Sequence, residues 1–204
     1  MTETTTRDRV PSAVTLWLDP VCPFSWNTAR WLIAAAGQAG FEIDWQLLNL
    51  AVLNTGKKLP EPQQKRMNDS RHVGRLMMAL HEELGPDALG QAYLAFAPRY
   101  FDHAAAVDAD LVDHVVQAVG AHRVGAAVLN DASFDEAVAK SHQRGQDALG
   151  EPAGSPLLTV DGHTVFGPVF TAVPADDQTR AVFDAVTALI RTPQFSQLHR
   201  PRTH

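Results

Sequence analysis

The stretch "DPVCPFSWNTARW", residues 19–31, contains Cys22, the only cysteine of the chain, and Ser25 three positions later. It follows "AVTLWL", residues 13–18, a short apolar run rich in strand-forming residues. Pro23 is typical of the first turn of a helix, where its missing N–H costs nothing. The sequence therefore places Cys22 just after a predicted strand and at the start of a predicted helix.

The segments that follow extend this pattern to a β-α-β order. Apolar residues recur at helical spacing until Gly37 and Gly40 supply a stop signal; they are Trp26, Ala29, Ile33 and Ala36. The next segment, "FEIDWQLLNLAVL" (41–53), begins with alternating apolar residues and predicts a second strand. The first part of the chain therefore predicts a strand, a helix and a strand.

Residues 62–150 differ from the flanking segments because they hold apolar stripes at helical spacing and no convincing strand. Gly85 and Gly120 end two of these stripes. Ser133 and Glu136 have the spacing of a capping box and predict the start of the last helix in this block. We therefore expect the whole segment to be helical.

Strand signals return near the C-terminus. "PLLTVDGHTVFG" (156–167) consists of two apolar runs around Asp161 and Gly162, a pair that strongly indicates a β-hairpin. Apolar residues at helical spacing in 182–190 predict a closing helix. The complete order is β-α-β, a helical insertion, and β-β-α, so the predicted fold class is α/β with an all-helical insertion.

Composition argues against several classes of function. The 204 residues include 17 Lys and Arg against 23 Asp and Glu, and the formal charge of -6 argues against nucleic acid as a partner. No apolar run has the length of a membrane span and the start is polar, so we expect no membrane partner and a cytoplasmic location. A single cysteine excludes an intrachain disulfide, and the nine histidines lack metal-binding spacing, so we expect no metal. Residues 1–11 and 198–204 are expected to be the least structured parts.

Cys22 lies where a thiolate is stabilised. A helix N-terminus presents unpaired N–H groups and about half a positive charge, and both favour the charged form of sulfur. Ser25 can direct its hydroxyl and its backbone N–H at that sulfur. We therefore expect the pKa of Cys22 to lie below its free value of about 8.5 and the sulfur to act as a nucleophile. The alternative is that Cys22 is a small buried apolar residue, as free cysteines often are.

The segment "WLDPVCPFSWNTARW" (17–31) resembles the active site of DsbA-like oxidoreductases of the thioredoxin superfamily, in which a C-P-x-C motif opens the first helix. Within that branch, the chain most resembles the actinobacterial mycothiol-dependent nitroreductases. Four further elements carry this resemblance: "LAVLN" (50–54), "KSHQRGQDALGE" (140–151), "GSP" (154–156) and "VFGPV" (165–169).

The resemblance implies a thioredoxin-like fold with an all-helical insertion. Residues 12–58 and 151–192 would form the thioredoxin-like domain, and residues 59–150 the inserted helical domain. The chain departs from the motif at Ser25, which stands where the second cysteine of C-P-x-C is expected. A dithiol cycle resolves its mixed disulfide with that second thiol. This chain must therefore use an external thiol, or carry out non-redox thiol chemistry.

The resemblance also implies which residues form the site. Cys22 and Ser25 take the catalytic positions. The residues implied to bind the thiol or the substrate are Pro23, Phe24, Asn54, His142, Ser155 and Pro156. In the family the peptide bond before this proline is cis, and it faces the cysteine.

Two positions depart from the family pattern, and two of the implied site residues have an alternative interpretation. Phe24 replaces the tryptophan of the motif, and Gln63 stands where the relatives have a tyrosine after "LPE". Asn54 also fits an ordinary turn asparagine. His142 also fits an exposed helix histidine, although it lies in the matching "KSH" element.

We therefore expect a cytosolic monothiol oxidoreductase in which Cys22 attacks a small-molecule disulfide or an activated substrate. A low-molecular-weight thiol, mycothiol by resemblance, would resolve the adduct as a co-substrate, without a tightly bound cofactor. We expect a monomer or homodimer whose helical insertion covers the groove above Cys22 and forms a substrate pocket. Two alternatives stay open: a transferase or isomerase similar to kappa-class glutathione transferases, and a non-catalytic protein that binds small molecules.

Overall fold

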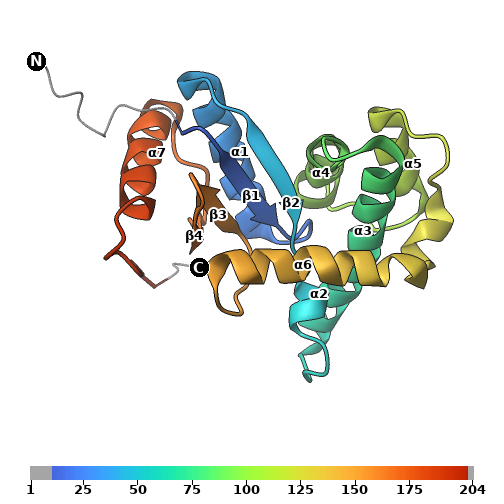
Figure 1. The fold of residues 1–204 in the computed structure, drawn as a ribbon. Coiled ribbons are helices and arrows are strands. Elements are labelled where there is room, and N and C mark those ends of the chain that lie inside the picture. The colour runs from blue at the N-terminus through green and yellow to red at the C-terminus, as the bar shows by residue number, and fades with distance from the viewer. Residues whose placement is uncertain (1–10, 202–204) are drawn as a thin grey trace, which may run out of the picture.

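The computed structural model describes residues 11–201, and its centre is a four-stranded sheet in the order β2-β1-β3-β4. Strand β1 (Val14–Leu18) pairs in parallel with β2 (Ile43–Leu47) and antiparallel with β3 (Leu157–Val160) (Figure 1). Strand β3 forms a hairpin with β4 (His163–Phe166). The segments expected to be least structured fall largely outside the described residues.

The predicted hairpin is confirmed, and its turn explains why. Asp161 and Gly162 both have positive φ, 49° and 84°. Two consecutive positive φ values match the right-handed twist of the flanking strands, and Asp-Gly adopts them at low cost. The carboxylate of Asp161 also accepts a hydrogen bond from the backbone N–H of Ser12 at 2.9 Å, which fixes the turn against the start of β1.

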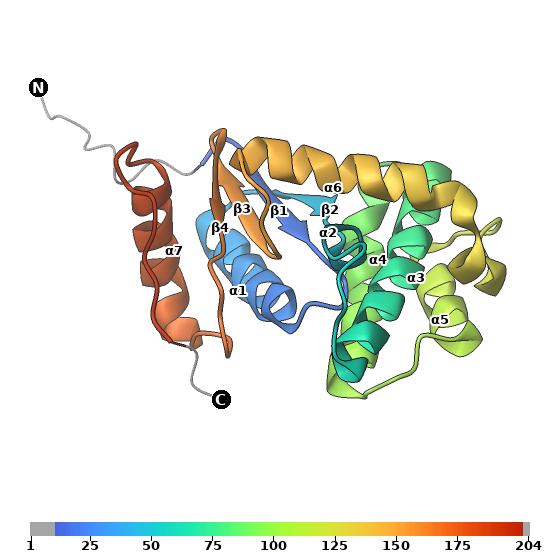
Figure 2. The same ribbon diagram turned by 90° about the horizontal axis from the view of Figure 1, so that it is seen from below.

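Helices cover both faces of the sheet. Figure 2 shows α6 (Asp135–Leu149) along one face and α1 (Pro23–Ala39) across the other, with α7 (Asp176–Ile190) beside α1. Of the two glycines predicted to end α1, Gly40 does so by adopting the left-handed conformation with φ 76°, whereas Gly37 lies within the helix. The rings of Trp31 and Phe183 meet between α1 and α7 with centroids 6.0 Å apart.

The second strand is shorter than the alternating pattern suggests. Residues 41–53 were expected to begin as a strand, but pairing stops at Leu47 and the chain turns into the short helix α2 (Leu50–Leu53). The side chain of Asn49 accepts a hydrogen bond from Val52 N at 3.1 Å and so caps α2. An apolar run alone does not separate a strand from a short capped helix.

The middle of the chain is helical, as predicted. Helices α3 (Glu61–Leu84), α4 (Ala88–Ala97) and α5 (Ala109–Val119) pack together beside the sheet (Figure 1). A π-helical turn (Pro98–Asp102) follows α4, and two 3₁₀ turns (Ala126–Asn130 and Ala132–Phe134) lie between α5 and α6.

The predicted capping box at Ser133 is wrong. Helix α6 begins at Asp135 without a side-chain cap, and the preceding 3₁₀ turn includes Ser133. Asp131 takes the capping role instead, because its side chain accepts from Ser133 N at 2.9 Å. The cap therefore belongs to the 3₁₀ turn and not to the helix.

Helix α6 connects the sheet to the helical block. It packs on the sheet so closely that a Cβ on Gly145 would lie 2.6 Å from the Leu48 side chain. At its other end, Asp135 accepts two hydrogen bonds from the Arg75 guanidinium on α3. The boundaries of the inserted domain at residues 59 and 150 stay a prediction, because α6 packs against both parts.

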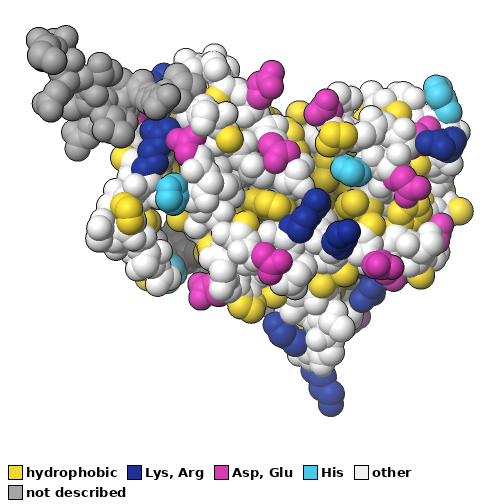
Figure 3. All heavy atoms as spheres, viewed as in Figure 1, with side chains coloured by type: hydrophobic (Ala, Val, Ile, Leu, Met, Phe, Trp, Pro, Cys, Tyr) yellow, Lys and Arg dark blue, Asp and Glu magenta, His cyan; other side chains and the backbone are white. Residues whose placement is uncertain are grey.

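One apolar core runs from the sheet through α1 into the helical block. Its largest fully buried side chains include Trp31, Tyr93, Phe96 and Phe183. On the face drawn in Figure 3, acidic and basic side chains are mixed over the surface, as is usual for a solvated surface. Within residues 11–201, every helix is too short or too polar to cross a membrane.

Candidate active site at Cys22

Cys22 occupies the N-cap position of α1, directly after the loop that follows β1. Its backbone N–H donates to Asp19 O at 3.1 Å, and its carbonyl accepts from Trp26 N at 3.2 Å. Pro23 begins the helix, as predicted, because its missing N–H would have had no partner in the first turn. The local sequence therefore fixes the sulfur at the mouth of the helix.

The Cys22 sulfur is enclosed. Cys22 is 4% exposed, and its thiol donates to the carbonyl of Ser155 with a Sγ–O distance of 3.4 Å. Burial raises the pKa of the thiol, and this outweighs the Ser25 hydroxyl and the Ser25 and Phe24 N–H groups, which lower it. The prediction of a lowered pKa is therefore wrong for this conformation, because it omitted burial.

Ser155 and Pro156 lie beside Cys22, as the resemblance implies. The peptide bond between them is cis. The hydroxyl oxygens of Ser25 and Ser155 are 2.6 Å apart, and Ser155 Oγ accepts from Asp19 N at 2.7 Å. The structure therefore brings Cys22, Ser25 and Ser155 together from two segments that are far apart in the sequence.

A second loop also packs against α1. The peptide bond between Gly167 and Pro168 is cis as well. Thr28 Oγ1 donates to the Pro168 carbonyl at 2.7 Å, and Asn27 Nδ2 donates to Phe170 O at 3.0 Å. The "VFGPV" element therefore supports the active-site helix from the side of the hairpin.

Asp19 lies beside the cysteine loop, and its role was not predicted from the sequence patterns above. It is fully buried, and its carboxylate accepts from Val21 N at 2.8 Å, Leu50 N at 2.6 Å and Ser70 Oγ at 2.5 Å. Burial is the largest influence on its pKa and raises it, while these donors lower it. Its position within the quoted "DPVCP" motif was the available signal.

His142 lies inside the protein and not on an exposed helix face. Its Nδ1 accepts from Asn49 N at 3.2 Å, and burial lowers the pKa of the imidazole. Asn49 Nδ2 donates in turn to Ser70 O at 2.8 Å. Hydrogen bonds therefore connect His142 through Asn49 and Ser70 to Asp19, but among the described residues none joins His142 to Cys22.

Asn54 has the contacts of a turn residue. Its side chain donates to Leu50 O at 2.8 Å and accepts from Lys57 Nζ at 3.3 Å. It also donates to Met67 Sδ on α3 at 3.6 Å, and within residues 11–201 its hydrogen bonds do not reach Cys22 or Ser155. A role of Asn54 in binding the thiol or the substrate stays a prediction. The same holds for Pro23 and Phe24, which are half-buried and follow Cys22 directly.

The helical block covers the first turns of α1 with aromatic side chains. Trp26 meets Tyr93 of α4 edge-on at 6.0 Å and stacks on Phe101 of the π-helical turn at 6.3 Å. Among the described residues, the fully buried hydroxyl of Tyr93 has no hydrogen-bond partner. Burial is the main reason why the pKa of Tyr93 is raised, and the charges of Cys22 and Asp19 add to the effect.

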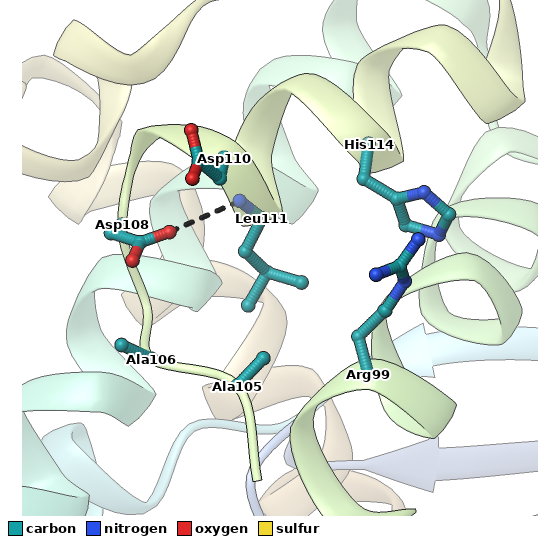
Figure 4. A pocket seen from close by; sticks show the side chains of 7 residues that line it. All are labelled: Arg99, Ala105, Ala106, Asp108, Asp110, Leu111 and His114. Atoms are coloured by element: carbon teal, nitrogen blue, oxygen red, sulfur yellow. Dashed lines mark hydrogen bonds between the residues drawn. The ribbon is translucent and has the colours of Figure 1, made fainter. Parts of the chain in front are cut away.

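A cavity of about 240 Å³ lies between the π-helical turn and α5. Figure 4 shows Arg99 and His114 on one side of it and Asp108 and Asp110 on the other. Cys22 does not line this cavity, and its exposure of 4% means that the sulfur does not face an open pocket in this conformation. The expected substrate pocket at Cys22 stays a prediction.

No group of three His, Cys, Asp or Glu side chains suited to a metal ion is found in residues 11–201. The site is therefore described by one sulfur, two serine hydroxyls and the buried Asp19 carboxylate. This arrangement suits chemistry at sulfur, because N–H and O–H donors converge on the atom that carries the charge.

Two solved structures share the fold. A probable DsbA oxidoreductase from Streptomyces coelicolor superposes with a TM-score of 0.55 and 18% identity, covering 93% of this chain and 93% of that chain. A candidate protein-disulfide isomerase from Pseudomonas syringae gives a TM-score of 0.51 and 20% identity, covering 83% of this chain and 92% of that chain. The fold is therefore the predicted thioredoxin-like fold with a helical insertion.

Together, the fold and the family match define an oxidoreductase with the fold of DsbA-like proteins. Residues 21–200 match the profile of the Rv2466c-like family, which is described as mycothiol-dependent nitroreductase Rv2466c. The match spans most of the chain, and the protein belongs to this family. Rv2286c, an uncharacterized protein of Mycobacterium tuberculosis, is 30% identical over 200 residues, covering 94% of this chain and 83% of the relative. Family membership favours an oxidoreductase over the transferase, isomerase and non-catalytic alternatives.

Proposed function

We propose that the protein is a monothiol exchange enzyme, in which Cys22 attacks a small-molecule disulfide and mycothiol resolves the adduct. The observation that carries this proposal is the arrangement around the sulfur. Ser25 stands where a second thiol would be, and its hydroxyl is 2.6 Å from that of Ser155. The chain has only one cysteine, so resolution must come from outside.

The exchange proceeds in two balanced steps. The Cys22 proton passes to solvent, and the thiolate attacks one sulfur of the disulfide, forming a mixed disulfide and releasing the other sulfur as a thiolate. The mycothiol thiolate then attacks the mixed disulfide at the substrate sulfur and releases the Cys22 thiolate. One disulfide and one thiol are consumed, and one disulfide and one thiol are formed.

Access to the sulfur controls the first step. Burial is the largest influence that raises the pKa of Cys22, and the Ser25 hydroxyl, Ser25 N–H and Phe24 N–H lower it. When the residues that bury the sulfur move apart, the cost of burial falls while these donors remain. We infer that exposure of the sulfur and formation of the thiolate occur together, so the closed protein holds an unreactive thiol.

The choice of mycothiol and of disulfides rests on the family and on two substitutions. The family description names a mycothiol-dependent activity. Phe24 and Gln63 replace the tryptophan and tyrosine expected from the resemblance. We therefore propose disulfides as substrates in preference to nitro compounds, within a cytosolic location where low-molecular-weight thiols are abundant.

The test is intact mass after separate incubation with the disulfides of mycothiol, glutathione and cysteine. We expect one mycothiol addition per chain, reversed by excess reduced mycothiol, and slower addition from the other two. Cys22→Ser is the matched control and should gain no mass. An absence of any adduct after prolonged incubation with all three disulfides would contradict the proposal.

A further inference from the structure

We propose that Asp19 is a positioning residue, whose buried carboxylate fixes the cysteine loop against the helical insertion through Ser70 of α3. This inference rests on the proposed function in one respect only, which is the substrate that Cys22 attacks. The connection itself is a property of the resting protein, and it can be measured without any disulfide substrate.

The carboxylate of Asp19 joins three separate segments. Its donors are the N–H of Val21 in the cysteine loop, the N–H of Leu50 at the start of α2, and the hydroxyl of Ser70 on α3. A fully buried carboxylate is tolerated only where such donors satisfy it. Loss of any one of them therefore affects the geometry of the others.

The backbone of Asp19 completes the link to the sulfur. Its N–H donates to Ser155 Oγ at 2.7 Å, and its carbonyl accepts from Cys22 N at 3.1 Å. Ser155 O in turn accepts the Cys22 thiol hydrogen. One residue thus contacts the cysteine loop, the cis-proline segment and the helical insertion.

Ser70 holds α3 against this junction by more than its bond to Asp19. Its hydroxyl accepts from Ala51 N at 3.2 Å, and its carbonyl accepts from Asn49 Nδ2 at 2.8 Å. One turn later, Gly74 lets α3 approach, since a Cβ there would lie 2.5 Å from Asn49 Nδ2. A shift of α3 must therefore break bonds that end on Asp19.

Because Asp19 is charged, its effect on the pKa of Cys22 distinguishes its role from a purely structural one. The negative charge of its carboxylate raises the pKa of the Cys22 thiol, in the same direction as burial. A neutral side chain at this position removes that repulsion and loosens the loop. Both effects favour the thiolate, so Cys22 becomes more reactive at neutral pH.

The experiment measures the rate of Cys22 alkylation by iodoacetamide against pH in the full-length protein. Asp19→Asn is expected to move the midpoint to lower pH and to speed alkylation at pH 7 several-fold. Ser70→Ala, which removes one donor and keeps the small buried volume, should shift the midpoint in the same direction by less. This second variant keeps the test decisive if Asp19→Asn does not fold.

Asp135→Asn is the matched control. It breaks the Arg75–Asp135 ion pair within the helical insertion. This pair lies at the start of α6 and not at the cysteine loop. The variant should lower stability and leave the alkylation midpoint in place. The proposal is overturned if the Ser70 and Asp19 variants keep the wild-type midpoint, or if Asp135→Asn moves it equally. These readings concern alkylation alone, so they are separate from any failure to form a mycothiol adduct.

Discussion

Two influences of opposite sign act on the Cys22 sulfur. The donors near the helix mouth could be inferred from "VCPFS", because they lie within three residues of the cysteine. The burial of the sulfur could not, because it depends on segments distant in the sequence, such as Ser155, whose carbonyl accepts the Cys22 thiol hydrogen. The local sequence therefore predicted the donors around the Cys22 sulfur but not the burial that raises the pKa of its thiol.

Because the pKa of Cys22 is raised in the folded protein, the free energy of unfolding should fall at alkaline pH. A folded-state pKa above the unfolded value of about 8.5 stabilises the protein below that value, and the stabilisation is lost as pH rises through the folded pKa. Wild type should therefore lose more stability than Cys22→Ala between pH 7 and pH 10. Urea denaturation at both pH values tests this. Parallel losses in the two proteins would contradict it, since both retain Tyr93.

The hydroxyl of Tyr93 is expected to reduce stability. A buried hydroxyl without a partner costs about 1 kcal/mol or more, so Tyr93→Phe should raise the free energy of unfolding by about 1 kcal/mol. Tyr100→Phe is the matched control, because the Tyr100 hydroxyl donates to Asp69 at 2.9 Å. This control should lose stability by a similar amount. A loss in Tyr93→Phe, measured by urea denaturation, would mean that its hydroxyl has a partner.

Among the secondary-structure elements, the sequence predicted those with local signals. Pro23 and Gly40 bound α1, and Asp161-Gly162 formed the hairpin turn, because each residue type is selected by the backbone conformation it must adopt. Helix α2 was missed, since its cap at Asn49 lies inside an apolar run. The cap at Asp131 was missed because Ser133 offered a competing local pattern.

Gly74 is required by packing between elements and not by its backbone conformation. A Cβ there would meet Asn49 Nδ2 at 2.5 Å, so Gly74→Ala should lose about 1–3 kcal/mol despite the better helix propensity of alanine. Gly37→Ala in α1 is the matched control, because its Cβ would meet nothing within 4 Å. It should gain about 0.5–1 kcal/mol. Thermal unfolding measures both, and a gain in Gly74→Ala would show that α3 can move away from Asn49.

At the scale of the whole molecule, the sequence predicted the order of the elements and the position of Cys22. It did not predict how the cysteine loop contacts the helical insertion. Ser155 was placed at Cys22 by the resemblance, whereas no pattern pairs Asp19 with Ser70 across 51 positions. Such contacts depend on how α3 docks against the sheet. The sequence therefore places Cys22, Ser25 and Ser155 together, whereas Asp19 and its bond to the helical insertion require the structure.

The Arg75–Asp135 pair joins α3 to α6 and should stabilise the helical insertion above acidic pH. Arg75 lowers the pKa of Asp135, so the stabilisation is present above the free carboxyl pKa of about 4 and is lost as pH falls through the folded value. Because the Asp135 side chain is 49% exposed, Asp135→Asn should lose only about 1 kcal/mol at pH 7. This difference from wild type should vanish near pH 2, as measured by urea denaturation. A difference that persists there would assign the effect to packing.

The fate of a preformed mycothiol adduct tests the monothiol account most directly. Wild type and Ser25→Cys are each loaded with one mycothiol, freed of excess thiol, and followed by intact mass. We expect wild type to keep its adduct until reduced mycothiol is added. Ser25→Cys should release mycothiol unaided and become lighter than the reduced chain by two hydrogens, because a thiol three residues along the helix can reach the mixed disulfide. Spontaneous loss of the adduct from wild type, at the rate seen in Ser25→Cys, would contradict the requirement for an external thiol.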